Sequence, residues 1–142
     1  MRVVLDTNTL VSAWLWRGTP FRLLQTLIEQ QSELVTSPAL LAELEEILQR
    51  PRFAARLAER RTSVEELIGL YRAVAMQVSP LSTPRVVTTD ADDDHVIACA
   101  LAGQAELIVS GDRDLLTLHP FRHIQILNAA DALRMIQERT LT

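Results

Sequence analysis

Short apolar runs that close on a polar or acidic residue constrain the fold of this chain most strongly. They occupy residues 2–6 ("RVVLD"), 33–37 ("ELVTS"), 106–110 ("ELIVS") and 124–128 ("IQILN"), with "RVVTT" at 85–89 as a further candidate. Runs of this length and composition are typical of buried parallel strands. Helical patterns fill the segments between them, so the sequence predicts an α/β fold with a parallel sheet of about five strands covered on both faces.

Capping residues mark where the helices begin. Ser37 precedes Pro38, which combines an N-cap with a proline in the first turn. Ser63 and Glu66 form a capping-box pattern, and Asn128 is expected to cap the last helix. The expected helices cover residues 9–16, 20–30, 39–50, 52–61, 63–78, 95–103 and the C-terminal segment.

The composition fits one soluble globular domain spanning residues 1–142. Apolar residues make up 48% of the chain and charged residues 23%, which is typical of a folded protein. No apolar run reaches the length of a membrane span, and the apolar part of the N-terminus is too short for a secretory signal. We therefore expect a cytoplasmic protein without a membrane partner, in which the single cysteine, Cys99, is a small core residue.

Carboxylates concentrate where the predicted strands end. Asp6 ends the first strand, and Asp112 and Asp114 follow the fourth. Four more acids lie between the third strand and the next helix: Asp90, Asp92, Asp93 and Asp94. Because sites in open α/β sheets form outside the carboxyl ends of the strands, these groups are expected at one edge. Glu43 joins them as a candidate, since its spacing from Leu40 and Ile47 puts it on an inward helix face.

Helix capping explains one or two of these acids but not the whole set. Like charges at ~4 Å repel by about 4 kcal/mol at an effective dielectric near 20. A bound divalent cation would remove that penalty. The donors are oxygens, and the three histidines show no ligand spacing with cysteine, so the metal expected is Mg²⁺ or Mn²⁺. His95 fits a helix-surface position better than a catalytic base.

Four motifs in order resemble the PIN-domain family. They are "VLDTN", "SPALLAEL", "DADDDHVIACALA" and "IVSGDRDLL", and the likeness is greatest to bacterial PIN toxins of toxin–antitoxin pairs. The resemblance covers nearly the whole chain and implies a three-layer α/β/α fold. It also implies a metal-dependent endoribonuclease that hydrolyses single-stranded RNA to a 5′-phosphate and a 3′-hydroxyl. A cognate antitoxin protein and a second copy of the chain are the candidate protein partners.

The resemblance also assigns roles to individual residues. The four catalytic and metal-ligating acids fall on Asp6, Glu43, Asp93 and Asp112. Residues expected to orient those ligands are Asn8, Asp90, Asp94, Ser110 and Asp114. Spacing alone does not choose between Asp93 and Asp94. The family often has Asn at the position of Asp94, which favours Asp93 as the ligand.

Contacts to an RNA substrate have to come from a chain with a net charge of −4. All 14 basic residues are arginines, and Arg52, Arg56 and Arg60 recur every four residues with only Glu59 placed to pair with them. This stripe is a candidate RNA-binding surface. It also fits a solvated helix face or a dock for an acidic partner. Trp14 and Trp16 fit core or dimer packing better than base stacking.

Two other α/β families also place an aspartate after the first strand and use Mg²⁺. Haloacid-dehalogenase-like phosphatases need "DxD" there, whereas this chain has "DTN", and they usually use a lysine at the site. Phosphate-receiver domains also carry a lysine, and this sequence has none. The open alternatives are a non-catalytic PIN-fold interaction module and, less well supported, a Mg²⁺-dependent phosphatase-like hydrolase.

Overall fold

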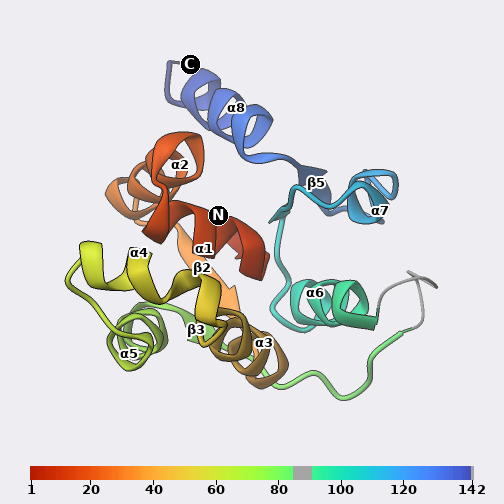
Figure 1. Cartoon of the computed structure of the whole chain (residues 1–142). Helices are drawn as coiled ribbons and strands as arrows, with labels where there is room; N and C mark the ends of the chain where they lie inside the picture. The colour runs from red at the N-terminus through yellow and green to blue at the C-terminus, as the bar shows by residue number, and fades with distance from the viewer. Residues whose placement is uncertain (85–90, 142) are drawn as a thin grey trace.

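Strands and helices alternate along the chain in the computed structural model, which describes residues 1–84 and 91–141 (Figure 1). The strands are β1 (Arg2–Leu5), β2 (Glu33–Thr36), β3 (Met76–Gln77), β4 (Leu107–Val109) and β5 (Gln125–Leu127). The helices are α1 (Thr7–Leu15), α2 (Gly18–Glu29), α3 (Pro38–Leu48), the short 3-10 helix η1 (Pro51–Phe53), α4 (Ala54–Glu59), α5 (Val64–Val74), α6 (Ala91–Ala102), α7 (Arg113–Leu116) and α8 (Ala129–Leu141).

The strands form one parallel sheet in the order β3-β2-β1-β4-β5. The prediction of a parallel sheet of about five strands is therefore confirmed. The chain first builds outward from β1 to β3, and then returns to add β4 and β5 on the other side of β1. The carboxyl ends of β1 and β4 consequently lie at the switch point of the sheet, where α/β proteins bind ligands.

Alternation along β1 separates two layers of helices. Val3 and Leu5 lie in a core cluster with side chains of α1, α2, α3, α5 and α8. Val4 points to the opposite face and packs with α6, including Ile97 and Ala100. Both faces of the sheet are therefore buried, which confirms the three-layer α/β/α fold.

The third strand differs from the prediction. The helix expected over 63–78 ends at Val74, and Met76–Gln77 instead forms the edge strand β3. Ala75 adopts an extended backbone that leaves the helix, and the free side of β2 then pairs with the following residues. Helical periodicity was the wrong guide here, because the backbone partners come from a distant strand. The strand expected at 85–89 lies outside the described residues.

Several helices also begin or divide differently from the expectation, and α2 begins at Gly18 rather than Pro20. α1 begins at Thr7, directly after β1, and α6 begins at Ala91, four residues before the expected start. Asp92, Asp93 and Asp94 therefore lie within the first turn of α6, where carboxylates interact favourably with the helix dipole. The helix expected over 52–61 divides into η1 and α4, which ends at Glu59.

The predicted N-cap residues act as expected, while the carboxylate of Glu66, predicted to complete a capping box, contacts Thr62. The side-chain oxygens of Ser37, Ser63 and Asn128 accept hydrogen bonds from the backbone N–H groups of Leu40, Glu66 and Asp131. The carboxylate of Glu66 accepts from the Thr62 hydroxyl at 3.3 Å. Across the described parts of the chain, no helix is both long and apolar enough to cross a membrane.

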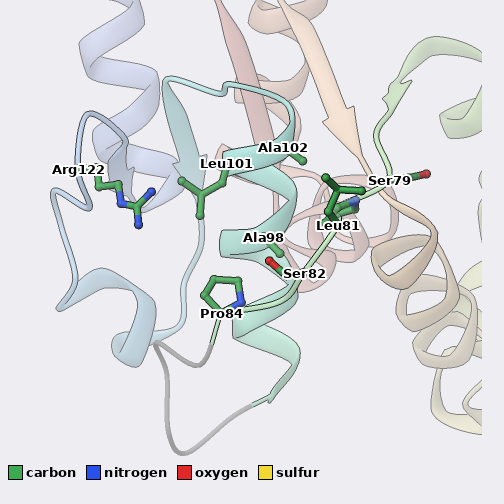
Figure 2. A pocket seen from close by; sticks show the side chains of 9 residues that line it. Ser79, Leu81, Ser82, Pro84, Ala98, Leu101, Ala102 and Arg122 are labelled. Atoms are coloured by element: carbon green, nitrogen blue, oxygen red, sulfur yellow. The ribbon is translucent and has the colours of Figure 1, made fainter.

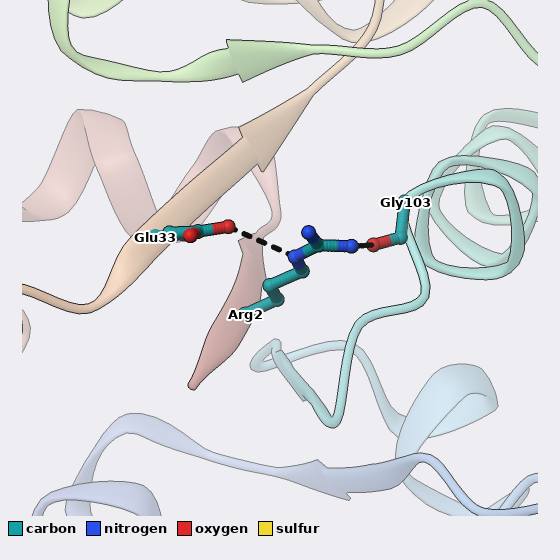
Figure 3. Close-up of polar contacts among 3 residues, drawn as sticks. All are labelled: Arg2, Glu33 and Gly103. Carbon is teal, nitrogen blue, oxygen red and sulfur yellow. Dashed lines mark hydrogen bonds and ion pairs between the residues drawn. The ribbon is translucent and has the colours of Figure 1, made fainter.

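The amino ends of β1 and β2 are joined to the end of α6 by one arginine (Figure 3). Arg2 Nε donates to Glu33 Oε2 at 2.8 Å, and Arg2 Nη1 donates to the carbonyl oxygen of Gly103 at 3.1 Å. A Cβ atom at Gly103 would lie 2.6 Å from Val35 Cγ1, so glycine lets this end of α6 approach β2. This charged edge lies at the end of the sheet opposite to the carboxyl ends of the strands.

Candidate functional site

The carboxyl ends of β1 and β4 bring Asp6 and Ser110 together. Leu5 pairs with Val109 in the sheet, and the Asp6 N–H donates to the Val109 carbonyl oxygen at 3.0 Å. The residue that follows each strand therefore lies at the same edge. Ser110 is fully buried, and its hydroxyl donates to Asp6 Oδ2.

Asp6 is a buried carboxylate held by neutral donors. Its side chain is the N-cap of α1, where Oδ1 accepts from the Thr9 N–H at 2.8 Å. Only 6% of the residue is exposed. Burial raises the pKa of Asp6, although the hydrogen bonds from Ser110 and Thr9 lower it in part, and the charge of Asp112 raises it further. The ionised form of Asp6 is therefore costly in the protein alone, and a nearby cation would stabilise it.

The turn after β4 positions Asp112 and Asp114. The Asp112 N–H donates to Ser110 Oγ at 2.9 Å, so one hydroxyl contacts both Asp6 and this turn. The Asp112 side chain in turn caps α7 by accepting from the Asp114 N–H at 2.8 Å. These local hydrogen bonds hold both carboxylates next to the end of β4.

Asp93 reaches the same place from α6. One carboxylate oxygen from each of Asp93, Asp112 and Asp114 lies within 4.8 Å of the other two. Asp93 and Asp94 are buried, whereas Asp92 is exposed. Asp114, expected from the sequence to orient the ligands, thus lies in the carboxylate cluster itself. Three oxygens of this kind at this separation fit a hard divalent cation such as Mg²⁺ or Mn²⁺.

Glu43 is held by a residue that the sequence analysis missed. Glu43 lies half-buried on α3, and its Oε1 accepts from the Thr7 hydroxyl at 2.9 Å. Thr7 is buried in the first turn of α1, directly after Asp6. The hydrogen bond therefore links Glu43 on α3 to the first turn of α1, next to Asp6. In the sequence, Thr7 is marked only by its position directly after Asp6 in "VLDTN".

The other predicted site residues fall in several places. Asn8 is exposed on the first turn of α1, and Asp90 lies outside the described residues. His95 is half-buried on α6.

The arginine stripe does not lie on one helix: Arg52 is in η1, Arg56 is in α4, and Arg60 follows the end of α4. The stripe is split because Pro51 starts a 3-10 turn before the α-helix begins.

The two described cavities lie away from the carboxylates. The larger one, about 520 Å³, lies between the segment 79–84, the outer side of α6 and Arg122 (Figure 2). The smaller one, about 220 Å³, is lined by the start of α3, the segment 79–83 and His95. Among the described residues, none of the predicted acidic ligands lines either cavity.

The family of the chain follows from its sequence match. Residues 2–114 match the family model of the PIN domain. This chain belongs to the PIN-domain family. The match includes β1, α3, the acidic turn of α6 and the turn with Asp112 and Asp114, so the motifs that suggested the family lie within it. No curated protein matches the sequence at a significant level.

Solved structures resemble this PIN domain in fold. One is VapBC2 from Rickettsia felis bound to a DNA fragment from its promoter, with a TM-score of 0.62 and 14% identity. Another is FitAcB from Neisseria gonorrhoeae, with a TM-score of 0.55 and 15% identity. Each similarity covers 90% of this chain and 98% of the other chain. At these identities the similarity establishes a shared fold.

Proposed function

We propose that this PIN domain is a Mg²⁺- or Mn²⁺-dependent endoribonuclease that hydrolyses single-stranded RNA. The observation that carries the proposal is the grouping of Asp93, Asp112 and Asp114 carboxylate oxygens within 4.8 Å. These acids come from two elements far apart in sequence, and Ser110 links one of them, Asp112, to Asp6. One of these carboxylates is buried, one is half-buried and one is exposed, and their convergence from two elements fits a cation better than it fits helix capping alone.

The proposed ligands are Asp6, Glu43, Asp93 and Asp112, with Asp114 beside them. When bound, one or two ions would activate water and offset the charge that grows on the attacking and leaving phosphodiester oxygens. The carboxylates bind and orient, and no covalent nucleophile from the protein is required. A bound cation would offset the repulsion between these carboxylates and an anionic substrate.

Neutral donors around the site have a positioning role in this proposal. Ser110 holds Asp6 through its hydroxyl proton and the Asp112 N–H through its oxygen. Thr7 holds Glu43 in the same way. Since hydroxyl and amide donors carry no full charge, they orient carboxylates without neutralising them. Asn8, Asp90 and Asp94 are proposed to support the ligands.

We also propose that the chain is the toxin of a toxin–antitoxin pair and acts in the cytoplasm. The motifs shared with bacterial PIN toxins support this, as does the fold shared with the VapBC2 and FitAcB structures. Candidate partners are single-stranded RNA, a cognate antitoxin and a second copy of the chain. Arg52, Arg56 and Arg60 are the predicted RNA contacts.

Cleavage of a single-stranded RNA with and without Mg²⁺ tests the proposal. Asp6→Asn and Asp93→Asn should each lower the rate by about a thousandfold, or about 4 kcal/mol of transition-state stabilisation. Asp94→Asn removes one charge from the same turn and should retain most activity, because the family resemblance tolerates Asn there. Excess EDTA should abolish cleavage by the wild type.

The Asp6→Asn variant is purified in parallel with the wild type. Any cleavage that remains in this sample then reports contaminating ribonucleases. Equal cleavage by this variant and the wild type would contradict the nuclease proposal and favour the interaction module. Hydrolysis of a phosphomonoester with no cleavage of RNA would favour the phosphatase-like alternative. Equal losses from Asp93→Asn and Asp94→Asn would show that the two neighbours were ranked wrongly.

A further inference from the structure

The two tryptophans of this chain have different surroundings. Trp14 is half-buried, and its ring meets Tyr71 edge to face with 5.8 Å between the centroids. Trp16, directly after α1, is 49% exposed. Trp14 therefore matches the expected core packing, whereas half of Trp16 faces solvent. A single exposed aromatic ring is ordinary on a protein surface, so the case for a binding site depends on the groups around Trp16.

Two arginines lie over aromatic rings here: Arg56 of α4 over Trp16, and Arg52 of η1 over the neighbouring Phe53. The Trp16 ring meets Phe53 edge to face at 5.6 Å between centroids. The Arg56 guanidinium carbon lies 5.2 Å from the centre of the Trp16 ring, and that of Arg52 lies 4.7 Å from the centre of Phe53. We call Trp16, Arg52, Phe53 and Arg56 the aromatic–arginine surface. It combines a partly exposed π-system with two guanidinium groups.

Arg60 belongs to the scaffold of this surface rather than to its exposed part. Its Nε donates to the Leu15 carbonyl oxygen at 3.1 Å, which satisfies a backbone acceptor at the end of α1. This hydrogen bond ties the end of α4 to the end of α1. The three arginines are regularly spaced in the sequence, but Arg60 binds a backbone carbonyl whereas Arg52 and Arg56 lie over aromatic rings.

The local charge is strongly positive in a protein of negative net charge. Residues 50–61 contain five arginines and one glutamate, whereas the whole chain carries −4. The glutamate, Glu59, pairs with Arg56 at 3.1 Å, but both side chains are partly exposed, so the pair is weak and can exchange. Partners of this surface are thus expected to be anionic and to offer flat groups that stack.

The aromatic–arginine surface and the carboxylate site lie at opposite ends of α1. Asp6 precedes α1 and Trp16 follows it, so they are separated by about 15 Å along the helix axis at 1.5 Å per residue. A single-stranded polymer held at the carboxylates could extend along α1 to this surface. Arginines that contact phosphates and aromatic rings that stack on bases are the usual combination for single-stranded nucleic acids.

We propose that the aromatic–arginine surface binds single-stranded RNA several nucleotides away from the cleaved bond. Trp16 stacks on a base, and Arg56 and Arg52 contact phosphates or stack on neighbouring bases. The proposal rests on the proposed nuclease function, since it concerns the same substrate. It adds a binding subsite at the opposite end of α1 and removes Arg60 from the predicted RNA contacts.

Binding of fluorescently labelled oligouridylate, measured by anisotropy in EDTA, tests the surface apart from cleavage. Trp16→Ala and Arg56→Gln should each weaken binding by about 5- to 100-fold, the range for losing one stacked base. Arg56→Gln should also make the salt dependence of log K shallower by about 0.7, the value for one phosphate on a single strand. Trp16→Phe should restore much of the affinity lost in Trp16→Ala.

Arg134→Gln is a matched control, because Arg134 is also an arginine in an i,i+3 ion pair, with Asp131 on α8. This variant removes the same charge and should bind like the wild type. In Trp14→Phe, where Trp16 is the remaining tryptophan, oligouridylate should quench the fluorescence. Equal affinity and salt dependence in Arg56→Gln and Arg134→Gln would overturn the proposal.

A change in oligomeric state in Trp16→Ala with unchanged RNA binding would also overturn it and would assign the surface to contacts between copies of the chain. The outcomes for this surface are distinguishable from those for the nuclease proposal. Selective loss of binding in Trp16→Ala and Arg56→Gln would support the surface even if the wild type cleaves no RNA. Wild-type binding by both variants would overturn the surface even if cleavage is robust.

Discussion

Carboxylates at the two ends of the parallel sheet have different hydrogen-bond partners. At the amino end, Glu33 is paired with the guanidinium of Arg2, and both side chains are partly exposed. At the carboxyl end, Asp6 is buried and receives hydrogen bonds from the Ser110 hydroxyl and the Thr9 N–H. A guanidinium neutralises its partner, whereas neutral donors only orient it. Asp6 is thus oriented by neutral donors while burial keeps its ionised form costly, a cost that a bound cation would offset.

The largest difference between the two ends should be in catalysis. Asp112→Asn removes one charge from the carboxyl end and should lower RNA cleavage by orders of magnitude, at 1.36 kcal/mol per tenfold. Glu33→Gln removes one charge from the amino end and should leave the rate within about twofold. Initial rates with Mg²⁺ at saturating RNA measure both. Similar losses in the two variants would mean that overall charge, and not a specific site, controls activity.

Thermal stability should show the second difference. Mg²⁺ or Mn²⁺ at a hundredfold excess over its Kd should stabilise the wild type by about 2.7 kcal/mol. Asp6→Asn should lose most of this gain, because it removes the buried charge that the cation would stabilise. Glu33→Gln should respond to metal like the wild type. Identical melting curves of the wild type in EDTA and in Mg²⁺ would contradict a metal site.

Thr7 tests whether neutral donors orient the ligands. Thr7→Val keeps the shape of the side chain but removes the hydroxyl that donates to Glu43. A hydrogen bond to a charged group contributes about 1.5–3 kcal/mol, so the Mg²⁺ concentration for half-maximal activity should rise by about tenfold or more. Thr7→Ser keeps the hydroxyl and should retain the wild-type requirement. A merely structural role for Thr7 would lower stability in both variants without moving the metal requirement of either.

The smallest effect is expected at the amino end. Arg2→Gln removes the ion pair with Glu33 and the hydrogen bond to the Gly103 carbonyl oxygen. Exposed ion pairs contribute about 1 kcal/mol or less, so the free energy of unfolding should fall slightly and metal binding should be unchanged. A double-mutant cycle with Glu33→Gln, followed by chemical denaturation, isolates the pair. Coupling well above 1 kcal/mol would show that this edge is more than a surface salt bridge.

Much of the fold was predictable because its signals are local. Apolar runs ending in polar residues located β1, β2, β4 and β5, and N-cap residues such as Ser37 located helix starts. The edge strand β3 was missed because its two residues follow α5 and become a strand only by pairing with β2. The start of α6 was also misplaced, since an acidic first turn lacks the apolar periodicity that marks a helix.

The candidate site was also predictable only in part from the sequence. The order of elements along the chain put Asp6, Asp112 and the acids before Val96 near one edge, so their grouping was expected from the sequence. Asp114 was expected at the same edge, but only as a residue that orients the ligands. The sequence did not indicate that Asp114 shares the cluster with Asp93 and Asp112, nor that Thr7 holds Glu43. These contacts depend on how α3 and α6 pack on the sheet, which sets distances between residues far apart in the chain.

The sequence by itself determined the parallel sheet, the family and the sheet edge at which carboxylates gather. Each of these follows from periodicity, capping and the order of motifs, which act over a few residues at a time. Only the tertiary structure decided which oxygens lie within 4.8 Å of one another, and that Arg60 closes the end of α1 while Arg56 lies over an exposed tryptophan. The reason is physical: backbone pairing and side-chain contacts between distant segments form only when the layers pack, and no local pattern encodes their distances.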